Sequence, residues 1–67
     1  MKLHYYPETD TLYISLSDKS GVDAEEITED VVVDYDEDRR LLGIEIEHAS
    51  AWIDLTKLET HSLPIPG

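Results

Sequence analysis

Two segments of this chain alternate apolar and polar residues, and this alternation restricts the fold more than any other feature of the sequence. The apolar sets are Leu12, Ile14 and Leu16 in residues 11–17, and Leu42, Ile44 and Ile46 in residues 41–48. Successive side chains of a strand point to opposite faces of a sheet. Each segment is therefore expected to be a strand that buries one face and exposes the other.

Two further strands are expected beside these. Residues 3–6 favour β-structure and are followed by the turn-forming residues 7–10, so they should form a hairpin with residues 11–17. Residues 31–35 are the densest β-branched stretch of the chain. Residues 22–30 have no helical apolar stripe and are interpreted as an extended lead-in to that strand. Gly43 inside the last strand indicates a bulge or a close backbone contact.

The pattern changes after His48. Ser50 can cap a helix in which Trp52, Leu55 and Leu58 recur every three residues. Pro64 and Pro66 prevent a helix from continuing. We therefore expect an α+β fold, a four-stranded antiparallel β-meander with one C-terminal helix packed on one face. The expected organisation is a single small domain over residues 1–62 and a C-terminal tail over residues 63–67.

Charge limits the partners that such a chain can bind. Sixteen Asp and Glu residues face five Lys and Arg residues, which gives a net charge of −11. Nucleic acid and anionic membranes repel this charge, so neither is an expected partner, whereas a basic protein or a cation is compatible with it. The N-terminus has no apolar stretch of signal-peptide length, and no segment is long enough to span a membrane. A cytoplasmic location is expected.

The core of a 67-residue chain is small, and chains of this size commonly need a further source of stability. The absence of cysteine excludes disulfides and thiolate zinc sites. Self-association remains, and a homodimer is the simplest form of it. Its interface is expected where acids are sparse, at the residues Tyr5, Tyr13, Val32 and Trp52.

Asp34, Asp36 and Asp38 resemble the start of an EF-hand calcium loop, with Glu45 at its twelfth position. Arg39 stands where that loop needs glycine, and the flanking residues are expected strands, so a solvated turn is the favoured interpretation. A metal-binding or small enzyme-like domain that uses these three acids remains the alternative. The spacing of the three histidines, His4, His48 and His61, matches no metal-binding motif. The sequence also contains no phosphate loop or nucleophile elbow. No catalytic, cofactor or metal site is expected, and the chain is expected not to be an enzyme.

Two blocks of sequence resemble a known family. Residues 6–14, Tyr-Pro-Glu-Thr-Asp-Thr-Leu-Tyr-Ile, are similar to the opening "Y-D-x-x-x-D-x-L-Y-I" of the prokaryotic domain-of-unknown-function family 2283. Residues 31–36, residues 42–46 (Leu-Gly-Ile-Glu-Ile) and the pair Ala49-Ser50 resemble its second block. The resemblance covers roughly residues 2–51, and the departures, Pro7 and Arg39, both lie in turns.

This resemblance implies a small α+β domain without an assigned activity. Members of the family are sometimes encoded beside small toxin-like proteins, which implies an antitoxin-like role. Together with the charge, it predicts a small acidic protein-interaction module that associates with itself and neutralises a basic, toxin-like partner.

Overall fold

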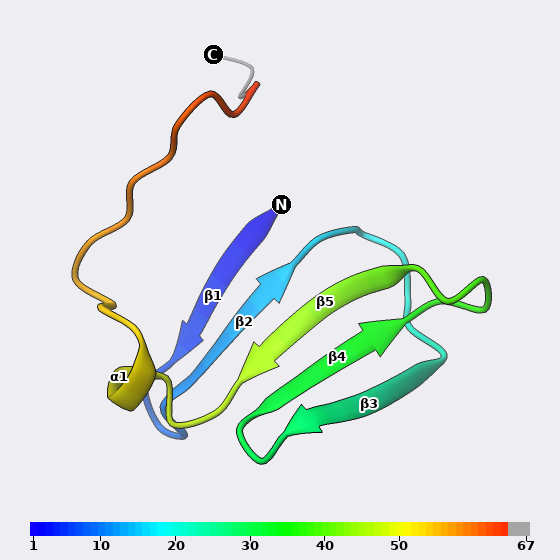
Figure 1. Ribbon diagram of the computed structural model, residues 1–67, viewed down its shortest axis with the longest axis horizontal. Coiled ribbons are helices and arrows are strands. Elements are labelled where there is room, and N and C mark those ends of the chain that lie inside the picture. The colour runs from blue at the N-terminus through cyan, green and yellow to red at the C-terminus, as the bar shows by residue number, and fades with distance from the viewer. Residues whose placement is uncertain (65–67) are drawn as a thin grey trace.

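The computed structural model describes residues 1–64 and contains one antiparallel sheet and one short helix (Figure 1). The elements are β1 (Lys2–Tyr6), β2 (Thr11–Ser15), β3 (Asp23–Thr28), β4 (Val31–Tyr35), β5 (Leu41–Ile46) and α1 (Ala49–Trp52). The α+β class and the antiparallel sheet are confirmed. Of the expected tail, residues 65–67 lie outside the described residues.

The sheet has five strands in the order β1-β2-β5-β4-β3, so the prediction of a four-stranded meander is wrong. The missed strand is β3, in the segment that was interpreted as a lead-in. All six of its residues are exposed, and within residues 1–64 it lies at the edge of the sheet, paired with β4 alone. Backbone pairing to β4 and a hydrogen bond from the Tyr35 hydroxyl to Glu25 at 2.7 Å hold this edge strand, and the acids on β3 discourage pairing with other chains. Its sequence therefore carries no alternating apolar signal.

The order also differs from a meander because β2 pairs with β5 and not with β3. Residues 16–22 cross the ends of β5 and β4 to reach the far edge. The amides of Leu16 and Ser17 donate to the carbonyl of Leu42, and the amide of Val22 donates to the carbonyl of Tyr35. This crossing helps to bury Leu42, which with Val33 and Ala49 forms the buried apolar core.

The register of the strands separates two faces. Leu3, Ile14, Ile44 and Val33 stand opposite one another along the sheet, and so do Tyr5, Leu12, Ile46 and Val31. We call the face that carries these residues the apolar face. The other side, here called the polar face, carries His4, Tyr13, Glu45, Val32 and Glu26, with Ser15, Gly43, Asp34 and Ala24 beside them. The predicted facing of Leu12, Ile14, Ile44 and Ile46 is confirmed.

The predicted C-terminal helix is confirmed, but it is only four residues long and does not extend across one face of the sheet as expected. It lies where β1 ends and β2 begins (Figure 1), and Ala49 is its one buried residue. His48, in the left-handed region at φ 53°, precedes the helix, and Ser50 lies inside it instead of capping it. The Asp54 side chain accepts hydrogen bonds from the amide and hydroxyl of Thr56. Such local bonding competes with helical hydrogen bonds.

Candidate functional site

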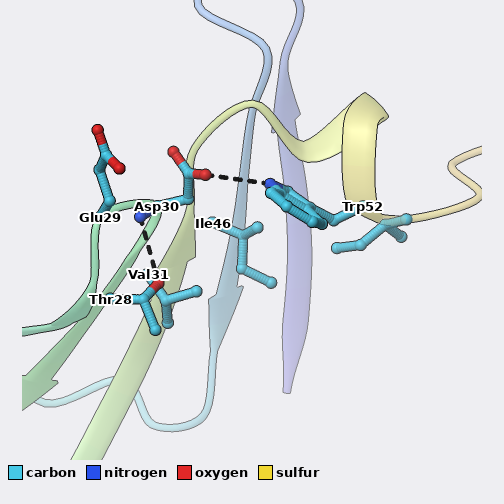
Figure 2. Close-up of a pocket in the computed structure, with 7 residues that line it drawn as sticks. Thr28, Glu29, Asp30, Val31, Ile46 and Trp52 are labelled. Carbon is cyan, nitrogen blue, oxygen red and sulfur yellow. Dashed lines mark hydrogen bonds between the residues drawn. The ribbon is translucent and has the colours of Figure 1, made fainter.

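The apolar face is left largely uncovered by the short helix. Along one end of it runs a groove of about 540 Å³, shown in Figure 2. Its floor is apolar and includes Val31 and Ile46, while Trp52 stands on one side and Asp30 on the other. Trp52 is 70% exposed, so its indole forms a wall open to solvent. This combination of an apolar floor with an acidic rim is suited to contact with another molecule.

A second groove of about 280 Å³ lies at the β1 side of the same face. The sheet contributes Leu3, Tyr5 and Leu12, and the chain after α1 contributes Ile53, Asp54, Leu55, Lys57 and Leu58. Ile53 lines both grooves, so the two lie on either side of this residue. The apolar face is thus hollowed on both sides of Ile53 and has no layer of secondary structure upon it within residues 1–64.

Asp10 ties the first hairpin to the helix. Its carboxylate accepts hydrogen bonds from the Tyr5 hydroxyl at 2.6 Å and from the Ser50 hydroxyl at 2.6 Å, and the Ser50 amide also donates to it. The amide of Ala49 donates to the Asp10 carbonyl at 2.9 Å. The hydrogen bonds from Ser50 and then from Tyr5 lower the pKa of Asp10, because they favour its charged form. Asp10 is therefore a structural clamp.

Asp30 forms a second clamp, which joins the residue before the helix to the last residue of the helix. Its two carboxylate oxygens bind different partners: His48 Nδ1 at 2.9 Å and Trp52 Nε1 at 3.2 Å. The hydrogen bond to Asp30, followed by the attraction of its charge, raises the pKa of His48. Asp30 also holds the turn after β5, since its carbonyl accepts the Glu47 amide at 2.7 Å. This clamp fixes the Trp52 wall of the groove in Figure 2.

On the polar face, the Tyr13 ring lies over Gly43 and its hydroxyl donates to Asp34 at 2.9 Å. That hydrogen bond, supplemented by burial, raises the pKa of Tyr13. A register shift between Asp34 and Tyr35 lies directly beside Gly43. The prediction that Gly43 marks a bulge or a close contact is therefore confirmed, and the close contact is made by an aromatic side chain.

The structure does not bring Asp34, Asp36 and Asp38 together. Asp34 binds Tyr13 on the polar face, whereas Asp36 accepts the amides of Asp38 and Arg40, and these bonds lower the pKa of Asp36. Arg39 occupies the left-handed region at φ 66°, a backbone conformation that glycine adopts at less cost than arginine. Residues 1–64 contain no group of three or more His, Asp or Glu residues placed to hold a metal ion.

The three histidines also lie apart from one another. The His4 ring stacks near Tyr6, with centroids 4.2 Å apart, His48 binds Asp30, and His61 lies beside Glu59. The expected interface residues do not share a face, because Tyr5 belongs to the apolar face while Tyr13 and Val32 belong to the polar face.

Sequence reasoning did not identify the clamps at Asp10 and Asp30. Asp10 and Ser50 belong to the two sequence blocks that resemble the family, forty positions apart. Their shared membership was the one feature of the sequence that could have indicated a contact between them. No pattern in the sequence pointed to the contacts that Asp30 makes with His48 and Trp52.

Within the described residues, no helix is long and apolar enough to cross a membrane. No curated protein and no solved structure gives a significant match to the chain. A family model, described as protein of unknown function (DUF2283), matches residues 2–50, which include both strands of the first hairpin, the Gly43 strand and the Asp10–Ser50 clamp. The chain therefore belongs to the domain-of-unknown-function family 2283.

Proposed function

We propose that this protein is a non-enzymatic protein-interaction module whose apolar face binds a second copy of the chain. The observation that carries the proposal is its accessible surface of 5416 Å². A folded monomer of its mass, 7.6 kDa, is expected to expose about 4,300 Å². The chain therefore exposes about 1,100 Å² more than a self-sufficient domain of this size.

The shape of the molecule accounts for this excess. Its principal extents are 34 × 33 × 18 Å, so it is a single layer rather than a sphere. Large apolar side chains remain exposed on the apolar face and after the helix, among them Leu3, Tyr5, Trp52, Leu55 and Leu58. A single antiparallel sheet normally packs its apolar face against another layer. A second copy would supply that layer.

The area and the charge both fit a dimer through this face. If each copy buried the excess, the interface would total about 2,200 Å², a size found in obligate homodimers. Repulsion between two chains of charge −11 opposes association. The centre of the apolar face is formed by Leu12, Ile14, Ile44 and Ile46, however. Its acids lie at the periphery: Asp23 and Glu25 on the edge strand β3, and Asp30 and Asp54 at the rims of the two grooves. The facing copies can therefore meet where charge is low.

Two matched variants of β1 test this proposal. Leu3 is 46% exposed on the apolar face, and its neighbour His4 is exposed on the polar face. Leu3→Lys should raise the dimer dissociation constant about tenfold to a hundredfold, because it buries an unpartnered charge at the interface. His4→Lys adds the same charge to the same strand and should leave the dissociation constant nearly unchanged.

Sedimentation equilibrium at tens of micromolar would measure both variants and the parent chain. A parent chain that stays at the monomer mass would refute the proposal. Equal effects of Leu3→Lys and His4→Lys would show that the apolar face is not the interface.

Binding of a basic protein is a second candidate function, and the distribution of ion pairs favours it. Within residues 1–64, Lys or Arg pairs with only two carboxylates, those of Asp18 and Glu59, and both pairs are exposed. Within the described residues, most of the sixteen acids therefore have no Lys or Arg partner and can meet a cationic surface. The probe is the product of the adjacent gene, if that product is basic. A stoichiometric complex stable at about 150 mM salt would support neutralisation, and binding no stronger than that of polylysine would refute it.

A further inference from the structure

The chain after the helix has few ties to its own sheet. Residues 54–64, here called the C-terminal arm, contain no helix or strand and run past the β1 edge in Figure 1. The polar contacts of its side chains are local: Thr56 binds Asp54, and both Lys57 and His61 bind Glu59. Such contacts order the arm internally without holding it to the rest of the molecule.

The arm nevertheless carries apolar side chains that a monomer leaves in water. Leu58 is 71% exposed, and Leu55 and Leu63 are also exposed. Leu55 and Leu58 border the groove above Leu3 and Leu12, but they leave about 280 Å³ of it open. Close-packed contact would fill this space, because protein interiors leave few voids larger than a water molecule. The arm and the groove are both apolar, but the arm of one chain does not fill the groove of that same chain.

We propose that the two copies of the dimer exchange their arms, so that Leu55 and Leu58 of each chain fill the β1–β2 groove of the other. This inference rests on the proposed dimer and names the segment that completes its interface. An exchange of identical segments between two-fold partners makes the same contact twice and needs no second binding surface. The extended backbone at Ile53, φ −129° and ψ 138°, is where the arm departs.

Length and charge permit the exchange. Eleven extended residues span about 36 Å, which matches the 34 Å width of the molecule and lets the arm cross a facing sheet. The arm also carries little of the chain's charge: Asp54, Lys57 and Glu59 give it a net charge of −1, which leaves −10 for the rest. It can therefore approach the acidic partner copy with little repulsion.

Paired cysteines test the exchange directly, because the parent chain has no cysteine of its own. Leu3 and Leu58 border the same groove, so a Leu3→Cys/Leu58→Cys chain can form a disulfide there. Mild oxidation should give a covalent dimer on a non-reducing gel if the arms are exchanged. A disulfide within one chain would overturn the inference, and so would the absence of any disulfide. His4→Cys/Leu58→Cys is the matched control, since His4 lies on the polar face and should not crosslink.

A second measurement separates this inference from the dimer itself. In the full chain, Leu58→Ser should raise the dimer dissociation constant about tenfold to a hundredfold, because it removes a large side chain from the partner's groove. Ile27→Ser is the control: Ile27 is 54% exposed on β3, lines neither groove, and should change nothing. An unchanged dissociation constant in Leu58→Ser would overturn the arm exchange while leaving the dimer intact. A parent chain that is monomeric would overturn both.

Discussion

Gly43→Ala should destabilise the fold strongly although it adds a single methyl group. An ideal Cβ on Gly43 would lie 2.6 Å from Cζ of Tyr13, and the Tyr13 hydroxyl is the nearest atom of all. Real Cβ atoms do not approach other atoms this closely, so the Tyr13 ring must swing outward. The hydrogen bond from its hydroxyl to Asp34, now 2.9 Å, would then break.

The size of the effect follows from these two consequences. Crowding a packed site by one methyl group costs about 1–3 kcal/mol. Losing a half-buried hydrogen bond to a carboxylate costs about another 1–2 kcal/mol. Alanine in a strand recovers about 0.5–1 kcal/mol, because glycine loses more backbone freedom on folding. Gly43→Ala should therefore lower the free energy of unfolding by about 1–4 kcal/mol, less if the Tyr13 ring turns away at little cost.

A double-mutant cycle would show whether the Tyr13 ring causes this loss. In a Tyr13→Ala background, the added methyl group meets no ring, and Gly43→Ala should be neutral or stabilising by about 0.5–1 kcal/mol. Tyr13→Phe keeps the ring and removes only its hydroxyl, so it isolates the hydrogen bond at about 1 kcal/mol. Urea unfolding followed by circular dichroism, at one protein concentration throughout, gives these values. An equal cost of Gly43→Ala in both backgrounds would refute the reasoning.

Three further predictions concern protonation, a side-chain clamp and salt. The hydrogen bond to Asp30 raises the pKa of His48. The stability that this bond contributes is therefore fully present below the unfolded histidine pKa of about 6.5, and it is lost as pH rises through the higher pKa of the folded state. His48→Asn keeps a residue that tolerates positive φ, and thermal melting between pH 6 and 9 should show a flatter decline than in the parent. The hydrogen bonds to Asp10 lower its pKa, so their stabilisation is present above about pH 3.9 and is lost as pH falls through the folded value. Ser50→Ala should lower the melting temperature at pH 7 and narrow its drop toward pH 3, and a parallel shift of the whole curve would contradict this. Raising the salt concentration from about 10 to 150 mM should raise the melting temperature, because it shortens the screening length from about 30 to 8 Å and so weakens the repulsion among the acids. A lower melting temperature in salt would mean that specific ion pairs outweigh this net repulsion.

The sequence predicted the strands that need an apolar face and missed the one that does not. Alternation located β2 and β5, and β-branched residues located β4, because each of these strands contributes side chains to one side of the sheet. The edge strand β3 has exposed residues on both sides and is held by its backbone pairing to β4. The strand order was also missed, since alternation says which face is buried and not which strand lies alongside.

The length of the helix was overestimated because the spacing of its apolar residues was considered without the local hydrogen bonds that compete with helical ones. Trp52, Leu55 and Leu58 have helical spacing, yet the bonds between Asp54 and Thr56 support a turn where the helix would continue. A helix this short is marginal without tertiary packing, which here buries only Ala49. The candidate site changed as a result. The apolar face was identified correctly from Leu12 and Ile14, but a helix was expected to cover it. The expected interface therefore combined Tyr13 and Val32 of the polar face with Tyr5 and Trp52, which border the grooves of the apolar face.

The residues that carry the family resemblance in this chain have structural contacts rather than an evident chemical site. Asp10 and Ser50 clamp the helix to the hairpin, and Tyr13, Asp34 and Gly43 lock three strands together on the polar face. Asp10, Ser50, Tyr13, Asp34 and Gly43 do not line the grooves, although Tyr5, which donates to Asp10, borders the groove at the β1 side. Motifs of this kind specify a sheet with one face left open and do not by themselves specify what covers it. Partner choice would then depend on the side chains of the apolar face and the C-terminal arm, so substitutions there should change association while leaving the two clamps, and hence the fold, intact.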